Sequence, residues 1–158
     1  MPRPTARLAA MPRASGTSWS EQAQRVLAES HRHSGGARRA VVELLESQPC
    51  ALSALEIEDA LRVGKRRVAR ASIYRILDEL ERLDLVQKVE VGQAMARYEP
   101  IRGEHGHHHH LVCDSCGAVM PFTDPELERV IQKTSRRVPI DVAVHEIVLH
   151  GACADCRQ

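Results

Sequence analysis

Two Cys-x2-Cys pairs, Cys113/Cys116 and Cys153/Cys156, constrain this chain more than any other feature of its sequence. Two thiolates three positions apart around a tight turn can both reach one metal ion, at about 2.3 Å, so each pair is half of a tetrahedral site. Gly117 directly follows the first pair and suits such a turn. Because four thiolates leave no open coordination position, the pattern predicts a structural zinc ion and not a catalytic one.

The zinc ion is expected to hold the end of the chain against the segment that contains the first pair, because 36 residues separate the two pairs. Structural zinc of this kind contributes on the order of 10 kcal/mol to folding, more than the net stability of many small domains. The fifth cysteine, Cys50, has no partner in this pattern and is expected to be a small buried apolar residue.

The composition fits a globular protein, because 158 residues with 43% apolar content can bury a core. No stretch approaches the roughly 18 apolar residues of a membrane span, and the N-terminus lacks the apolar centre of a secretory signal. We therefore expect a cytoplasmic protein, in which thiols stay reduced and bind metal instead of forming disulfides.

The front of the chain carries helical patterns. Residues 1–18 are rich in Pro, Ala, Arg and Ser without periodicity and are expected to form a flexible leader. Helices are predicted over residues 19–31, 37–47, 54–61 and 73–83. Ser18 or Ser20 is the expected N-cap of the first, Ser53 forms a capping box with Glu56 in the third, and Ser72 caps the fourth.

After these helices the spacing of apolar residues changes from a helical period to the alternation of a strand. Residues 85–91 alternate as a strand does, Gly92 and Gln93 predict a turn, and residues 95–99 predict a returning strand. The last three of these helices and the hairpin that follows them are typical of a winged helix-turn-helix. In that fold the third helix, here 73–83, enters the DNA major groove. Basic and aromatic side chains near the start of that helix suit contacts with phosphates and bases: Arg67, Arg70, Tyr74 and Arg75.

Charge gives this interpretation weak support. Up to Pro100 the chain carries 16 Lys and Arg against 13 Asp and Glu, and beyond it 6 against 8. A positive front half is compatible with bound nucleic acid, whereas four aromatic residues are too few for a platform that stacks single strands. Because basic runs are also common on solvated loops, a winged helix that binds protein instead of DNA stays open.

Four consecutive histidines, residues 107–110, stand directly ahead of the first cysteine pair. If residues 107–112 form a strand, with the β-rich stretch 142–149 as its partner, neighbouring side chains point to opposite faces. The run then supplies two separate pairs of metal ligands, His108 with His110 and His107 with His109.

Each histidine pair needs further ligands. Candidates are Glu99 at the end of the hairpin, His145 in the expected strand 142–149, and Glu128 on a helix with Asp124 as N-cap and Pro125 in its first turn. His105 and His150 are weaker candidates. Mixed imidazole and carboxylate ligands suit Fe(II), Zn(II), Mn(II), Co(II) or Ni(II).

Three motifs together resemble the ferric uptake regulator family, which includes zinc-, manganese- and peroxide-responsive members. They are A-S-I-Y-R-I-L (71–77), H-H-H-H-L-V-C-D-S-C-G (107–117) and H-G-A-C-A-D-C (150–156). The resemblance covers residues 35–158. It implies an α+β fold, with a winged helix-turn-helix DNA-binding domain over 19–100 and a small α/β metal-binding and dimerisation domain over 101–158. It also implies a homodimer that, when loaded with metal, binds palindromic double-stranded DNA operators and represses transport or stress genes.

The resemblance assigns residues to these roles. It implies a structural zinc ion on Cys113, Cys116, Cys153 and Cys156, a regulatory metal on Glu99, His108 and His110, and a second metal site at His107, His109, Glu128 and His145. Tyr74 and Arg75 match recognition-helix positions and Arg38 or Arg39 the first basic helix, so the expected DNA contacts are Arg38, Arg39, Arg67, Arg70, Ser72, Tyr74 and Arg75. The regulatory metal is expected to be Fe(II) or Zn(II), with Mn(II) as an alternative.

The fourth regulatory ligand stays open. Family members usually take it from the DNA-binding domain, just before the helix that is expected here over 54–61, where this chain reads C-A-L-S. The candidates are Cys50, His33 and Gln87, and His105 competes with Glu99. The ending A-C-A-D-C and the stretch V-Q-K-V-E (86–90) resemble zinc-responsive members, while the ligand set equally fits iron.

Two other classes of function fit the sequence less well. A zinc or iron hydrolase with Glu104 or Glu128 as base would need an open metal position in a substrate pocket, and the sequence carries no catalytic signature beyond ligands. A metal buffer or chaperone would not need the basic front half. We therefore expect a regulator, with no enzymatic activity, no small-molecule substrate and no membrane partner.

Overall fold

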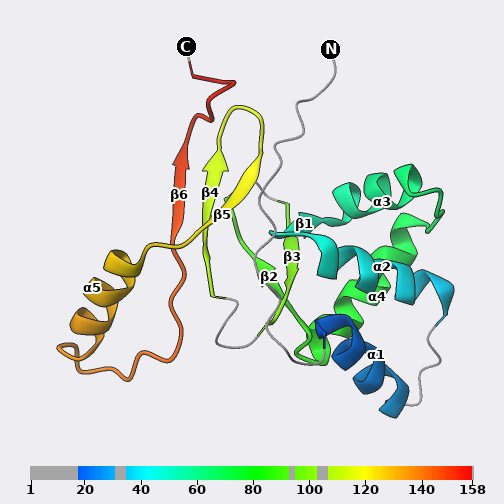
Figure 1. Ribbon diagram of the computed structural model, residues 1–158, viewed down its shortest axis with the longest axis horizontal. Helices are drawn as coiled ribbons and strands as arrows, with labels where there is room; N and C mark the ends of the chain where they lie inside the picture. The colour runs from blue at the N-terminus through cyan, green and yellow to red at the C-terminus, as the bar shows by residue number, and fades with distance from the viewer. Residues whose placement is uncertain (1–17, 31–34, 93–94, 103–106, 158) are drawn as a thin grey trace.

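The computed structural model describes residues 18–30, 35–92, 95–102 and 107–157. Its elements in chain order are α1 (Trp19–Glu29), α2 (Gly36–Ser47), β1 (Leu52–Ser53), α3 (Ala54–Val63), α4 (Arg70–Arg82), β2 (Val86–Val89), β3 (Arg97–Pro100), β4 (His109–Cys113), β5 (Val119–Phe122), α5 (Pro125–Ser135) and β6 (Val148–Gly151). The chain has the expected α+β fold (Figure 1). Apart from Ser18, the expected leader lies outside the described residues.

Side-chain caps fix the start of three helices, as the sequence predicted. The Ser18 hydroxyl accepts from the Glu21 N–H and the Glu21 carboxylate accepts from the Ser18 N–H, at 3.2 and 3.0 Å, which makes a capping box at α1. Ser53 and Glu56 form the same box at α3. Asp124 caps α5, with proline in the first turn.

The start of α4 differs from the prediction. The N-cap is Ala69, without a side-chain hydrogen bond, and the helix begins at Arg70, so Ser72 is not the cap. The Ser72 N–H instead donates to the Ala69 carbonyl at 2.8 Å, inside the first turn. Arg70 and Ala71 favour helix strongly enough to extend it without a capping side chain, and this places Arg70 on α4 itself.

Helices α1 to α4 enclose the main apolar core. Leu27, Leu45, Ile57 and Leu77 are at most 1% exposed there. Trp19 joins α1 to the turn between α4 and β2, because its indole N–H donates to the Leu85 carbonyl at 3.0 Å. Beside these helices lies a small antiparallel sheet in the order β1-β3-β2, so that β3 is its central strand. We call this part, up to Pro100, the helical half.

A second sheet follows in the order β5-β4-β6, with β4 antiparallel to β5 and parallel to β6. The strand expected over 142–149 is wrong in its bounds: β6 runs from Val148 to Gly151, and His145 precedes it in a segment without strand pairing. His107 and His108 likewise precede β4. The shift follows from the pairing of β4 with β6, in which Cys113 lies opposite Gly151 and brings the two cysteine pairs to one edge.

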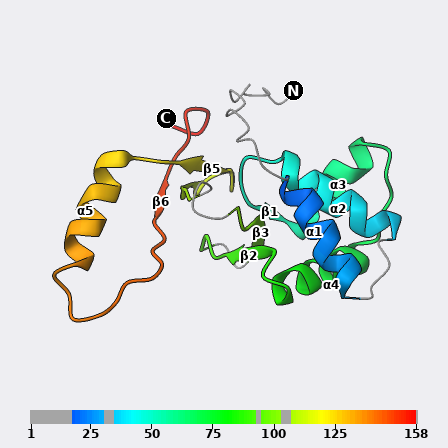
Figure 2. The ribbon, with the colours of Figure 1, turned by 60° about the horizontal axis from the view of Figure 1, so that its bottom comes forward.

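The two sheets lie between helices α1 to α4 on one side and α5 on the other, as Figures 1 and 2 both show. A small apolar cluster joins the sheets and consists of Ala51, Val89, Val91 and Val112. Helix α5 has no buried residue, and large apolar side chains near it are exposed: Val130, Val138, Ile140, Val142 and Val144. Within the described residues, no helix is long and apolar enough to cross a membrane.

Candidate metal centres

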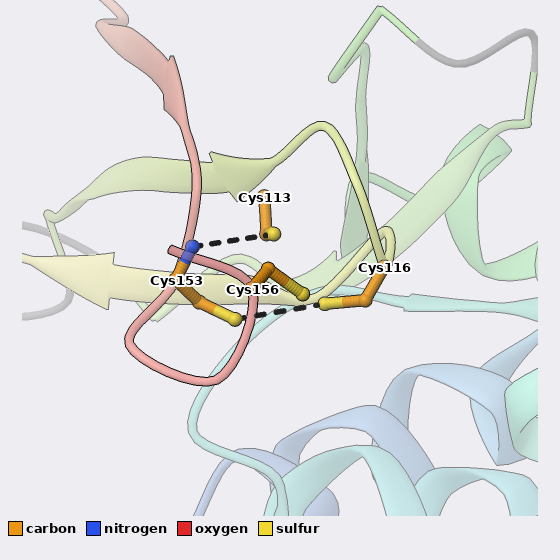
Figure 3. Close-up of side chains that lie close together, drawn as sticks. All are labelled: Cys113, Cys116, Cys153 and Cys156. Atoms are coloured by element: carbon orange, nitrogen blue, oxygen red, sulfur yellow. Dashed lines mark hydrogen bonds between the residues drawn. The ribbon is translucent and has the colours of Figure 1, made fainter. Parts of the chain in front are cut away.

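The four paired cysteines lie together at one edge of the second sheet (Figure 3). Cys113 ends β4 and Cys116 lies in the turn after it, while Cys153 and Cys156 lie in the turn after β6. The Sγ atoms of Cys116 and Cys153 are 3.8 Å apart. Two sulfurs that each lie about 2.3 Å from a tetrahedral metal are about 3.8 Å apart, whereas a disulfide bond measures about 2.05 Å. The cluster therefore fits one zinc ion that these four side chains would hold.

Backbone turns prepare this cysteine cluster for metal. Gly117 has a φ of +72°, which a glycine adopts without strain, and its N–H donates to the Cys113 carbonyl at 2.8 Å. The Cys153 N–H donates to the Cys113 sulfur at 3.3 Å. This bond is the main reason that the pKa of the Cys113 thiol falls to about 6. Hydrogen bonds with the other cysteines, of which that with Cys153 contributes most, raise the pKa of Cys156 to about 12. The cluster therefore retains a proton that a metal would displace.

A second cluster lies between the two halves of the chain, and we call it the hinge site. It consists of Cys50 from the loop between α2 and β1, Glu99 from β3, His108 and His110. One ligand atom from each lies within 4.8 Å of the others. The Glu99 Oε2 atom is 3.0 Å from His108 Nε2 and 3.3 Å from His110 Nε2. An imidazole nitrogen and a carboxylate oxygen on one tetrahedral metal would be about 3.3 Å apart.

The charged groups of the hinge site are buried, and their burial is energetically unfavourable unless a cation balances the carboxylate. Glu99 is 3% exposed and His110 1%. Burial by itself raises the pKa of Glu99, but hydrogen bonds from His108, His110 and Gln87 outweigh it and hold this pKa at about 2. Burial lowers the pKa of His110, but Cys50 and Glu99 raise it to about 9. A protonated imidazole therefore supplies the positive charge that a divalent metal would supply in its place.

A third cluster, which we call the helix-side site, joins the histidine segment to α5. It consists of His107, His109, Glu128 and His145. Glu128 Oε1 is 2.7 Å from His109 Nε2, and Glu128 Oε2 is 3.0 Å from His145 Nε2. The Nε2 atoms of His107 and His145 are 3.1 Å apart. His109 is fully buried, whereas His107 is 41% exposed, so this site is open on one side.

The structure thus separates the four histidines into the two expected pairs and brings every predicted ligand of each site together. Cys50, expected to be a buried apolar residue but also one of three candidates for the fourth regulatory ligand, is the fourth member of the hinge site. Gln87 instead donates to Glu99 Oε1 at 2.7 Å. His150 is outside the three clusters and pairs with Asp114 at 2.8 Å. The candidates His33, His105 and Glu104 lie outside the described residues.

Several of the expected DNA contacts lie on the exposed side of α4. Tyr74 is 45% exposed, and Arg75 is held over its own helix by the Ala71 carbonyl at 3.3 Å. Arg67 lies just before α4 and is exposed.

Of the other expected contacts, Ser72 lies in the first turn of α4, and three arginines are paired with acidic side chains. Arg70 pairs with Glu58 of α3 at 2.7 Å and Arg39 with Glu43 at 2.9 Å. Arg38 reaches across to the buried Glu79 of α4 at 2.7 Å. Arg38 therefore joins α2 to α4, in addition to any contact with DNA.

Arg97 is a residue that sequence reasoning missed. Its guanidinium donates to Glu56 at the start of α3 at 2.7 Å, to the Ala51 carbonyl at 3.2 Å, and to the Gly117 carbonyl at 3.1 Å. One side chain of β3 therefore touches the first turn of α3, the loop that carries Cys50, and the cysteine turn. No sequence motif marks it, because its three partners are distant in sequence and two are backbone atoms.

Comparison with known proteins agrees with this arrangement. The sequence profile of the ferric uptake regulator family matches residues 30–150. The ferric uptake regulation protein of Neisseria meningitidis serogroup A is 30% identical over 125 residues, which are 77% of this chain and 84% of that protein. The Bacillus subtilis protein of the same name is 33% identical over 114 residues, which cover 72% of this chain and 76% of that protein.

Solved structures show the same likeness. The Helicobacter pylori ferric uptake regulator, described with three functional metal-binding sites, has a TM-score of 0.75 and 26% identity, over 89% of this chain and 93% of that one. The Vibrio cholerae ferric uptake regulator shares the fold, with a TM-score of 0.71, 24% identity, and 82% and 98% of the two chains covered. The chain belongs to the ferric uptake regulator family. Members of this family are metal-responsive transcription regulators.

Proposed function

We propose that this protein is a metal-dependent DNA-binding repressor that senses Fe(II) or Zn(II) and controls genes of metal homeostasis. The observation that carries the proposal is the hinge site, whose ligands come from both halves of the chain. Cys50 and Glu99 belong to the helical half, and His108 and His110 to the segment of β4. An ion held by all four would fix the angle between the halves.

The helical half is the proposed DNA-binding domain, residues 19–100, in the form of a winged helix-turn-helix. Helices α2, α3 and α4 precede the antiparallel strands β2 and β3, which take the place of the wing. Helix α4 then enters the major groove, with the exposed Tyr74 and Arg75 toward the bases and Arg67 and Arg70 toward phosphates.

Residues 101–158 are the proposed metal-binding and dimerisation domain. The exposed apolar side chains around α5, such as Val130, Ile140 and Val144, support a second copy of the chain as the partner, because isolated soluble chains rarely leave such groups together in water. The four cysteines would hold structural zinc and keep this domain folded. The helix-side site would hold a further divalent metal, in line with the three functional sites described for the Helicobacter pylori relative.

Metal then acts by population shift. A bound ion supplies the positive charge that ties Glu99 and Cys50 to the two imidazoles, and it favours the orientation in which both recognition helices of a dimer fit one palindromic operator. A metal with equal affinity for both orientations would shift nothing. Coupling energies of this kind are typically about 1–3 kcal/mol, which corresponds to a change in DNA affinity of about 5- to 150-fold.

Operator binding with and without metal tests this function. The double variant His108→Ala, His110→Ala is expected to lose the metal dependence of DNA binding, while His150→Ala, outside the three clusters, keeps it. Fe(II), Zn(II) and Mn(II) are compared in separate titrations, and peroxide is added to the iron-loaded protein to detect a peroxide-responsive member. Unchanged metal dependence in the double variant would overturn the proposal. Tight metal binding with no DNA binding would point to a buffer or chaperone.

A further inference from the structure

The hinge site contains the thiol of Cys50, which the sequence left open between a buried apolar residue and a metal ligand. Cys50 is 8% exposed, yet among the described residues it belongs to neither apolar cluster, although its neighbour Ala51 does. Its sulfur lies within 4.8 Å of a ring nitrogen of His108, a ring nitrogen of His110 and a carboxylate oxygen of Glu99. A sulfur directed at two imidazoles and a buried carboxylate is in the position of a metal ligand.

The geometry of Glu99 limits the number of ligands at this site. Its Oε1 atom accepts a hydrogen bond from the Gln87 side chain at 2.7 Å, which leaves Oε2 to face the two imidazoles. Glu99 is thereby set to give one oxygen to a metal. Together with Cys50, His108 and His110 it offers four donors, the coordination number that zinc prefers.

The helix-side site differs from the hinge site both in the number of carboxylate oxygens that it offers and in having no thiol. Both carboxylate oxygens of Glu128 face imidazoles, Oε1 that of His109 and Oε2 that of His145, so Glu128 can give two oxygens. It contains no sulfur, and His107 leaves it partly open to water. Five or six nitrogen and oxygen donors, including water, can gather there, which suits several divalent metals.

We infer that Cys50 is the fourth ligand of the hinge site and makes it a four-coordinate thiolate site that selects Zn(II) over Fe(II) and Mn(II). The inference rests on the proposed function and narrows it to zinc as the sensed metal. Thiolate is a soft ligand that favours zinc, whereas Mn(II) favours oxygen donors and higher coordination numbers. Cys50 also lies three residues before Ser53, the N-cap of α3, so the ion that binds it holds the start of that helix.

Cobalt(II) spectroscopy tests the ligand directly and needs no DNA. The full-length protein first receives one equivalent of zinc, which the four-cysteine cluster takes, and then cobalt(II) chloride. A thiolate-to-cobalt charge-transfer band with intense tetrahedral d–d bands is expected, and Cys50→Ser should lose the charge-transfer band while keeping the zinc. A wild-type spectrum without the charge-transfer band, at a cobalt site that His108→Ala abolishes, would overturn the inference.

Selectivity is the second measurement. Competition titrations with Zn(II) and Mn(II) on wild type, Cys50→Ser and Cys50→Asp are expected to show zinc affinity at the hinge site lower by about tenfold or more in both variants. In Cys50→Asp the preference for zinc over manganese should fall further, because an oxygen replaces the sulfur. A ratio of zinc affinity to manganese affinity that is unchanged in both variants would refute the assignment of Cys50. Because these titrations contain no operator, their result stands whether or not the protein binds DNA, and a failure of DNA binding would count against the proposed function alone.

Discussion

Replacement of Arg97 by methionine is expected to destabilise the helical half and loosen its contact with the cysteine turn. Methionine keeps most of the apolar stem and removes only the guanidinium. That group donates to Glu56 and to the carbonyls of Ala51 and Gly117, at 2.7, 3.2 and 3.1 Å. The variant therefore leaves two carbonyls without their charged donor and one carboxylate without its cation.

The magnitude follows from the burial of each partner. The Glu56 side chain is 43% exposed, so its ion pair with Arg97 is screened by water and contributes about 1 kcal/mol or less. The Arg97 side chain is only 12% exposed, and each of its bonds to a carbonyl contributes about 1 kcal/mol, the net value of an ordinary hydrogen bond in a folded protein. The expected loss is about 2–3 kcal/mol. For a urea dependence of about 2 kcal/mol per molar, the unfolding midpoint falls by about 1–1.5 M.

Fluorescence of Trp19 is a suitable assay, because it is the only tryptophan and lies in the core of the helical half. The zinc-loaded protein is unfolded in urea, with Arg62→Ala as the matched control. Arg62 pairs with Asp59 on the surface, where both side chains are more than half exposed, and its loss should cost at most about 0.5 kcal/mol. If Arg97→Met shifts the midpoint no more than Arg62→Ala does, the contacts of Arg97 do not stabilise the helical half.

Three further outcomes are expected. The pKa of His110 is raised to about 9 in the metal-free protein, so its contribution to stability is complete below about pH 6.5 and is lost as the pH rises through about 9. Because metal must displace that proton, the metal affinity of the hinge site, measured by calorimetry, should rise roughly tenfold per pH unit up to about pH 9. A metal affinity that does not change with pH would contradict this. Arg75→Ala, at an exposed position of α4, should lower operator affinity in a gel shift by about 1–3 kcal/mol without a change in unfolding temperature. Leu77→Ala, whose side chain is fully buried, should cost about 2–5 kcal/mol in urea unfolding and leave the structural zinc in place.

Much of the fold and site followed from local patterns. Capping boxes at Ser18 and Ser53 predicted two helix starts, because the cap and its partner are three residues apart. The alternation of the histidines predicted two opposite faces, because neighbouring side chains in an extended chain point apart. The first ligand of each pair precedes β4 itself, yet the alternation already holds there.

What sequence could not supply depends on distant parts of the chain. The bounds of β6 were wrong because a run of apolar residues does not show which of them pair, and the pairing with β4 begins at Val148. Cys50 reaches the hinge site only through the loop between α2 and β1, and Arg97 works mainly through backbone carbonyls. Arg97 has no local pattern that could reveal its partners. For Cys50 the family resemblance offered one of three candidates, and no local pattern of the chain chose among them.

The four-histidine run also has a consequence for how the chain folds. A slip of β4 by one residue would turn each side chain to the opposite face, but it would still present imidazoles on both faces. Histidine ligands alone therefore define the register of β4 poorly, and early metal binding at the histidines could trap a shifted strand. The end of β4 lacks this ambiguity, because Cys113 must meet Cys153, whose N–H donates to its sulfur. Zinc at the cysteines should accordingly bind first and set the register that the other two sites require.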